Sequence, residues 1–189
     1  GYSKYFKGDN IYIISNNKLD NKLKMLAEYK EIPKENIMPY DENRLLDLYD
    51  DLEEEFLEDK EDGIFHHRLL IFDDVGYSGS LKNKQSGVIS KLISNGRHLG
   101  LSQIYTSQRF TMCSSIMKSN VTGACFGNTS MAEVDLISES FNYLNNKKEF
   151  INLFRKYTAK PRSFLCVNFT NEAGLYQDSE FKTIDLNNI

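Results

Sequence analysis

Apolar runs and amphipathic segments alternate along the chain. Short runs rich in Ile, Leu and Val predict strands, and segments with apolar residues every three or four positions predict helices. Predicted strands cover residues 10–15, 37–38, 68–74, 101–106, 121–126 and 163–169, and residues 175–184 predict a terminal hairpin. Predicted helices cover residues 19–30, 41–59, 85–94, 131–140 and 146–157, with a short helix within 110–119. This alternation predicts an α/β fold with a mainly parallel sheet and helices on both faces.

The length of 189 residues favours a single domain over residues 1–189. Hydrophobic residues make up 40% of the chain, and 12 Phe with 11 Tyr are enough to build a core, which excludes a chain disordered throughout. No apolar run approaches the roughly 20 residues that cross a bilayer, so we expect no membrane span. The cysteines (Cys113, Cys125 and Cys166) have no C-x-x-C spacing, which favours free thiols.

Charge is distributed unevenly, although the net charge is only −4. Residues 41–62 hold twelve acids and two bases, a sum of −10, so the remaining residues sum to +6. The acidic run is typical of the solvated face of a helix. Residues 75–132 hold no Asp or Glu but do hold bases: Lys82, Lys84, Lys91, Arg97, Arg109 and Lys118. Such a stretch suits a polyanion, and chance clustering in a Ser/Asn-rich region is the alternative.

Two carboxylates, Asp73 and Asp74, end the most apolar predicted strand. Ligands of open α/β sheets bind at the carboxyl ends of the strands. An apolar strand that closes in two acids is typical of a Walker B motif, in which one acid holds Mg²⁺ through its waters and the next polarises the attacking water. A turn or helix-capping pair after an ordinary core strand is an equal alternative for this segment by itself.

A basic loop, Gly96-Arg97-His98, precedes a strand that is followed by Thr106-Ser107-Gln108. If this strand neighbours the one that ends at Asp74, Gln108 lies beside Asp74, within reach of a γ-phosphate or its attacking water. An amide that caps the next helix is the alternative for Gln108. Arg97 carries a planar set of donors suited to phosphate, and an ordinary surface arginine is the alternative.

Together these segments resemble the poxvirus-type viral genome-packaging ATPases of the FtsK–HerA superfamily. The resemblance rests on the order of the Asp73-Asp74 strand, the Gly96-Arg97-His98 loop and Gln108, and residues 10–15 and 36–41 also look like that family. The family implies a RecA-like ATPase, usually a ring, that moves double-stranded DNA into a preformed capsid.

The resemblance implies a role for each matching residue. Asp73 matches the acid on the Mg²⁺ side, Asp74 the catalytic carboxylate, and Gln108 the polar sensor at the end of the next strand. Arg97 matches an arginine finger that acts on a neighbouring subunit's ATP, with Arg109 as the alternative. Lys82 and Lys84, after the acidic pair, are the residues that we expect to face DNA.

The chain departs from the family in one motif. It contains no G-x-x-x-x-G-K-[ST] loop, which would hold the β- and γ-phosphates. By the resemblance, this chain starts just after that loop, so we expect an N-terminally incomplete ATPase domain, inactive by itself. Loss of nucleotide binding is the alternative. We also expect the strand of that loop to lie beside the Asp73 strand, so that its absence leaves an open sheet edge.

The resulting hypothesis is an ATP- and Mg²⁺-dependent genome-packaging ATPase. Its partners would be double-stranded DNA, further copies of itself and capsid vertex or portal proteins, in the host cytoplasm, a viral factory or the virion. A non-catalytic adaptor that binds through its acidic helix is the alternative. A metal-dependent nuclease ranks third, because adjacent strand residues point to opposite faces, so Asp73 and Asp74 would not both bind one ion directly.

Overall fold

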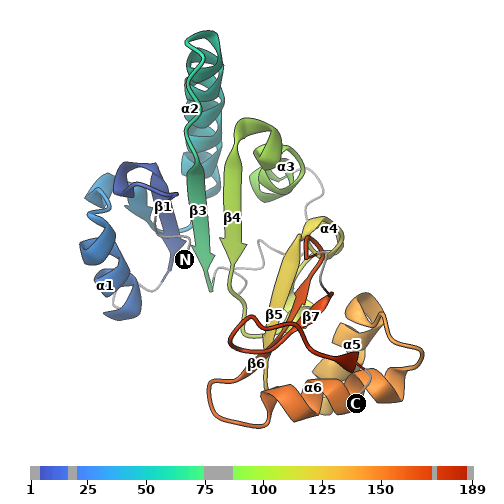
Figure 1. Cartoon of the computed structure of the whole chain (residues 1–189). Coiled ribbons are helices and arrows are strands. Elements are labelled where there is room, and N and C mark those ends of the chain that lie inside the picture. The colour runs from blue at the N-terminus through green and yellow to red at the C-terminus, as the bar shows by residue number, and fades with distance from the viewer. Residues whose placement is uncertain (1–4, 17–20, 75–86, 172–173, 187–189) are drawn as a thin grey trace. The chain divides into compact units, whose positions relative to one another are not determined.

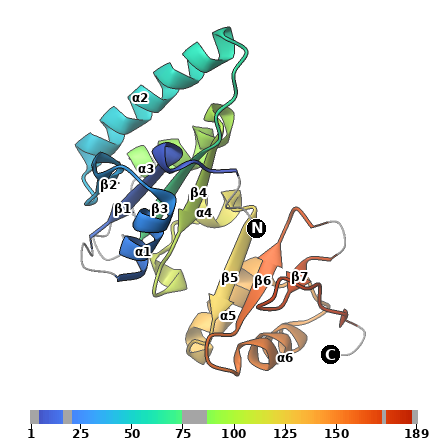
Figure 2. The ribbon, with the colours of Figure 1, turned by 60° about the vertical axis from the view of Figure 1, so that its left-hand side comes forward.

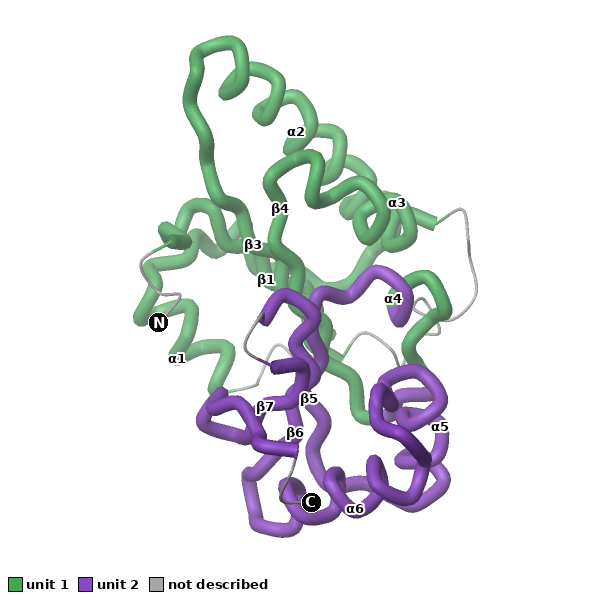
Figure 3. The backbone as a smooth tube through the Cα atoms, turned by 45° about the vertical axis from the view of Figure 1, so that its right-hand side comes forward, with its two compact units in different colours: residues 1–108, 112–117 green, residues 109–111, 118–189 purple. Residues whose placement is uncertain are grey.

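The computed structural model describes residues 5–16, 21–74, 87–171 and 174–186. The chain divides into two compact units (Figure 3). Unit 1 comprises residues 1–108 and 112–117, and unit 2 comprises residues 109–111 and 118–189. The short helix α4 (Ser115–Asn120) contributes residues to both.

Unit 1 is built on a parallel sheet of four strands (Figure 1). The strands β1 (Ile11–Ser15), β2 (Ile37–Met38), β3 (Arg68–Asp73) and β4 (Leu101–Tyr105) lie in the order β2-β1-β3-β4. All three strand pairs are parallel. The predicted α/β fold with a mainly parallel sheet is confirmed.

Helices connect these strands and cover both faces of the sheet (Figures 1 and 2). They are α1 (Asn21–Lys30), α2 (Glu42–Glu61) and α3 (Val88–Asn95). Alternate residues of β1 and β3, such as Ile13 and Ile71, pack with Leu23 and Leu26 of α1. The intervening residues, such as Phe72, point to the other face, where α2 and α3 lie (Figure 2). Burial on both faces explains why β3 is a continuous apolar run.

Helix α2 is a long amphipathic helix. Asp41 caps its start, because its carboxylate accepts a hydrogen bond of 2.9 Å from the amide of Arg44. Its buried residues are Leu45, Tyr49 and Leu52. The helix extends past the amino end of β3 (Figure 1). Most of its acids are exposed, as predicted.

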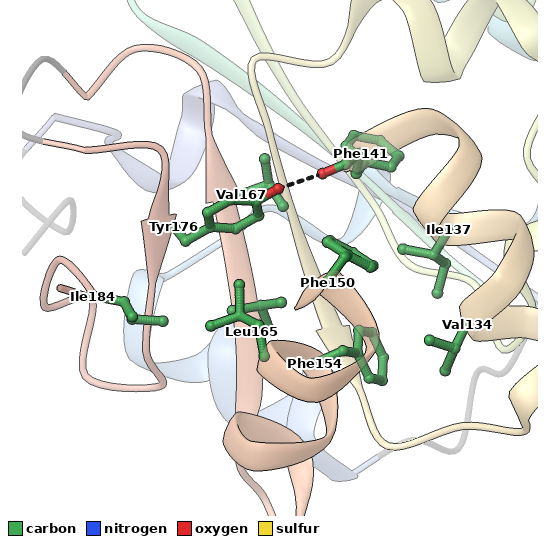
Figure 4. Packing of buried hydrophobic residues seen from close by; sticks show 10 residues of the cluster. Val134, Ile137, Phe141, Phe150, Phe154, Leu165, Val167, Tyr176 and Ile184 are labelled. Atoms are coloured by element: carbon green, nitrogen blue, oxygen red, sulfur yellow. Dashed lines mark hydrogen bonds between the residues drawn. The ribbon is translucent and has the colours of Figure 1, made fainter. Parts of the chain in front are cut away.

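Unit 2 pairs an antiparallel sheet with two helices. The strands β5 (Gly123–Gly127), β6 (Phe164–Asn168) and β7 (Tyr176–Gln177) lie in this order, and the helices are α5 (Met131–Phe141) and α6 (Lys147–Thr158). Figure 4 shows their shared core, in which Phe141, Phe150 and Phe154 pack with Leu165 and Val167. A bridge between Gln177 and Thr183 closes the predicted terminal hairpin.

Two expectations from the sequence are wrong. No further strand can lie beside β3, because β1 and β4 occupy its two sides; within the described residues, the two edge strands of this sheet are β2 and β4. Cys125 and Cys166 are not free thiols. They lie opposite each other on β5 and β6 with Cα atoms 4.3 Å apart and form a disulfide, which their separation of 41 residues hides in the sequence. Cys113 is free.

No helix within the described residues is long and apolar enough to cross a membrane.

Candidate functional site

The carboxyl edge of the parallel sheet collects five polar side chains. Because β1, β3 and β4 run in parallel, their ends lie at one edge, where open α/β sheets bind ligands. We call these five residues the carboxyl-edge cluster: Ser15, Asp73, Asp74, Thr106 and Gln108.

Asp73 accepts hydrogen bonds from two hydroxyl groups on the neighbouring strands. The Thr106 hydroxyl donates to Asp73 Oδ1 over 2.8 Å, and the buried Ser15 hydroxyl lies 3.3 Å from Asp73 Oδ2. The backbone amide of Asp74 donates to Thr106 Oγ1 over 3.1 Å. Thr106 therefore links the side chain of one acid to the backbone of the next and fixes the turn after β3.

Asp74 and Gln108 are in direct contact. Gln108 Nε2 donates to Asp74 Oδ2 over 2.7 Å. Asp74 has a φ of 50°, a left-handed conformation that only Gly, Asn and Asp adopt readily. This turn breaks the alternation of side chains along β3 and directs the Asp74 carboxylate toward the residues that follow β4.

The two strands that carry the cluster are firmly joined below it. Phe72 and Tyr105 stack with ring centroids 4.6 Å apart and planes at 6°. The Tyr105 hydroxyl donates to Gln103 Oε1 over 2.6 Å, and Gln103 Nε2 donates to the Leu92 carbonyl over 2.7 Å. Burial raises the pKa of Tyr105 above its ordinary value, so this phenol stays neutral. The cluster thus stands on a rigid base, which a catalytic constellation requires.

The other residues predicted for the site lie elsewhere. Arg97 is exposed in a 3-10 turn (Gly96–Leu99) before β4, at the amino edge of the sheet. One strand of five residues, about 16 Å at ~3.3 Å per residue, separates that edge from the cluster. Arg109 is exposed and follows Gln108 directly, in unit 2. Lys82 and Lys84 lie outside the described residues.

Sequence reasoning missed Ser15 and Thr106 as members of the site. Both are hydroxyl residues at the carboxyl ends of predicted strands, which was the available signal. What the sequence did not supply was the order of the strands. The parallel pairing of β1 with β3 brings Ser15 to Asp73, although 58 positions separate the two residues in the chain.

A second polar cluster lies at the amino end of β3. The side chain of Arg68 is only 4% exposed, and its guanidinium donates to Glu55 over 3.1 Å and to Asp59 over 2.8 Å. His66 Nδ1 lies 2.9 Å from Asp59. Burial by itself would raise the pKa of Asp59, but the hydrogen bonds from Arg68 and His66 outweigh it and lower the pKa below its ordinary value. This cluster anchors the carboxyl end of α2. Asp59 is therefore an exception among the solvated acids of this helix, because it is paired with both Arg68 and His66 and has a structural role.

The sequence of the chain matches one protein family. Residues 54–178 match the family model described as Poxvirus A32 protein. The chain belongs to this family. The resemblance to poxvirus-type packaging ATPases is thereby confirmed. No curated protein sequence matches the chain.

Solved structures share the fold at low sequence identity. The genome packaging NTPase B204 from Sulfolobus turreted icosahedral virus 2, in complex with AMPPCP, is 18% identical with a TM-score of 0.59, over 93% of this chain and 83% of that one. Its complex with sulfate gives 18% identity and a TM-score of 0.61, over 94% and 83%. The DNA-packaging ATPase B204 from Sulfolobus turreted icosahedral virus is 17% identical with a TM-score of 0.58, over 93% and 83%. The chain has the fold of these packaging ATPases.

Proposed function

We propose that the chain is part of a genome-packaging ATPase, which uses ATP hydrolysis to move double-stranded DNA into a viral capsid. Membership of the Poxvirus A32 protein family and the shared fold support this proposal. The observation that carries it is the contact between Asp74 and Gln108 beside Asp73, at the carboxyl edge of two neighbouring strands. The two units would work as one RecA-like ATPase domain.

In this mechanism, Asp74 activates the attacking water. The oxygen of the water attacks the γ-phosphorus while the carboxylate accepts a proton from that water. The bond between the γ-phosphorus and the bridging oxygen breaks, which gives ADP and inorganic phosphate. Gln108 holds Oδ2 of Asp74 through its 2.7 Å hydrogen bond, which leaves Oδ1 to face the water. Gln108, which follows β4, thereby fixes the position of the Asp74 carboxylate.

The residues around Asp73 fit a magnesium ion. Mg²⁺ prefers oxygen ligands and usually keeps several waters beside one or two carboxylates and the substrate phosphates. Asp73 supplies a carboxylate, and Ser15 and Thr106 supply hydroxyl groups next to it. Asp73 would hold the ion through its waters, and phosphate oxygens would complete the shell. When bound, the ion would neutralise charge on the phosphates.

Arg97 would act on a neighbouring subunit. It lies at the amino edge of the sheet, away from its own carboxyl-edge cluster, and is exposed. An arginine supplied by a second copy is typically worth about 10³–10⁵ in rate. This role requires a homo-oligomer, in keeping with a ring. Arg109, next to Gln108, is the alternative donor.

The DNA and capsid contacts belong to the same proposal. Lys82 and Lys84 would contact DNA phosphates with little sequence preference. A capsid vertex or portal protein would receive the DNA, and the protein would work in the host cytoplasm, a viral factory or the virion.

ATP turnover by the full-length protein that contains this chain tests the proposal. We expect hydrolysis that double-stranded DNA stimulates, and Asp74→Asn should lower turnover by about 10²–10⁴, the usual contribution of a general base. ATP binding by that variant should persist. Normal turnover by Asp74→Asn would remove Asp74 from the mechanism, and no turnover by the unmodified protein would favour a non-catalytic adaptor.

Mixing subunits tests the role of Arg97. Arg97→Ala and Asp74→Asn are each expected to be inactive, but mixed rings should regain activity where an intact Arg97 meets an intact Asp74. Mixtures that stay inactive at every ratio contradict an arginine that acts between subunits.

A further inference from the structure

Unit 2 contains a pocket that the proposed ATPase mechanism does not use. It has a volume of about 400 Å³, within the range of small-ligand sites. Its lining comes from the carboxyl ends of α4 and α5, from residues just after these helices and from the residue that follows β6. It comprises Lys118, Ser119, Val121, Ser140, Tyr143 and Phe169. We call it the aromatic–lysine pocket.

Two partly exposed aromatic rings form one side of this pocket. Tyr143 is 58% exposed and Phe169 is 40% exposed, and their ring centroids lie 5.6 Å apart at 75°. Phe169 also stacks on the buried Phe141 with centroids 6.0 Å apart. The amide of Tyr143 donates to the Tyr176 hydroxyl over 2.9 Å, which fixes its backbone to the core. Phe169 is therefore held against the core, and together with Tyr143 it offers a stacking surface.

Positive charge and hydroxyl groups complete the lining. Lys118 Nζ lies 4.0 Å from the centroid of the Phe110 ring, a cation–π contact that positions the ammonium group. Ser119 and Ser140 bring hydroxyl groups to the pocket, and its lining, as far as the structure describes it, includes no carboxylate. A ligand with an aromatic part and an anionic part suits this combination.

We propose that the aromatic–lysine pocket binds one nucleotide, with its base against Phe169 and Tyr143 and its phosphate at Lys118. The nucleotide would come from a nucleic-acid strand, and only this choice of source rests on the proposed function. A base reaches the pocket from a single strand or a duplex end, because bases inside a duplex are paired and stacked. Stacking on aromatic side chains with phosphate contacts is the usual mode of single-strand binding.

Binding of a labelled single-stranded oligonucleotide to the full-length protein tests this site. Phe169→Ala should weaken binding about 5- to 150-fold, the range that corresponds to loss of one stacked base. Lys118→Gln should reduce the slope of log affinity against log salt by about 0.7, the value for one phosphate contact on a single strand. Phe181→Ala and Lys160→Gln, exposed residues of unit 2 outside the pocket, are the matched controls and should bind as the unmodified protein does.

Further measurements distinguish a nucleotide of a nucleic-acid strand from a free nucleotide, and the pocket proposal from the ATPase proposal. If thymidine monophosphate binds equally well and both pocket variants weaken it, the pocket takes free nucleotides and the assigned chemistry stands. Unchanged binding of both ligands by Phe169→Ala and Lys118→Gln overturns the site. Asp74→Asn should leave oligonucleotide binding intact, so a failure of the ATPase proposal is visible separately as unchanged turnover.

Discussion

The buried hydroxyl of Tyr176 offers a quantitative test of the packing in unit 2. Tyr176 is 2% exposed, and its hydroxyl donates to the Phe141 carbonyl over 2.8 Å (Figure 4). The same hydroxyl accepts from the Tyr143 amide over 2.9 Å. Burial raises the pKa of Tyr176, so the group remains a neutral donor at ordinary pH. Tyr176→Phe removes one oxygen and leaves both backbone groups without this partner.

The expected cost follows from the two lost hydrogen bonds. Loss of the partner costs about 1–3 kcal/mol for the buried Phe141 carbonyl, and the part-buried bond to the Tyr143 amide adds about 0.5–1.5 kcal/mol. We therefore expect Tyr176→Phe to lower the free energy of unfolding by about 2–4 kcal/mol. Urea unfolding followed by circular dichroism measures this change. Tyr157→Phe is the control, because no hydrogen bond of its hydroxyl to the described residues is present. A loss below about 0.5 kcal/mol for Tyr176→Phe would refute the assigned bonds.

Three further predictions concern other contacts. Because the pKa of Asp59 is lowered from 3.8, its carboxylate stabilises the fold above that value, and this stabilisation is lost as pH falls through the lowered pKa. Asp59→Asn should therefore lower the free energy of unfolding in urea at pH 7 but not in strong acid. An equal loss of stability at both pH values would contradict the ion pair. Reduction of the Cys125–Cys166 disulfide, which closes a loop of about 41 residues, should cost at most about 4 kcal/mol in the same assay, and no change with dithiothreitol would argue against the bond. Thr106→Val should lower ATP turnover while Thr106→Ser retains it, since only the hydroxyl joins Asp73 to Asp74; equal activities would show that this link is dispensable.

Periodicity in the sequence predicted most elements within a few residues. The apolar run before Asp73 identified a strand buried on both faces, and the amphipathic pattern of α2 located that helix. These features are local, because burial on one or two faces imposes a pattern on neighbouring positions.

Features that depend on long-range pairing were not predictable in this way. The positions of Ser15 beside Asp73 and of Cys125 opposite Cys166 follow from strand order and register. In the sequence, Arg68 is an ordinary charged residue at the start of a strand. Only the packing of the end of α2 beside the start of β3 brings Asp59 to it. The contact of Asp74 with Gln108 was anticipated because it needs only two neighbouring parallel strands, whereas the roles of both residues stay predictions.

A double-mutant cycle on Asp74 and Gln108 tests the central claim most directly. Single-turnover ATP hydrolysis would be measured for Asp74→Asn, Gln108→Ala and the double variant of the full-length protein. If Gln108 works by holding the Asp74 carboxylate, the double variant should be no slower than Asp74→Asn, since residues that act as a unit are not additive. Independent effects that multiply in the double variant, or single variants with unchanged rates, would contradict the account.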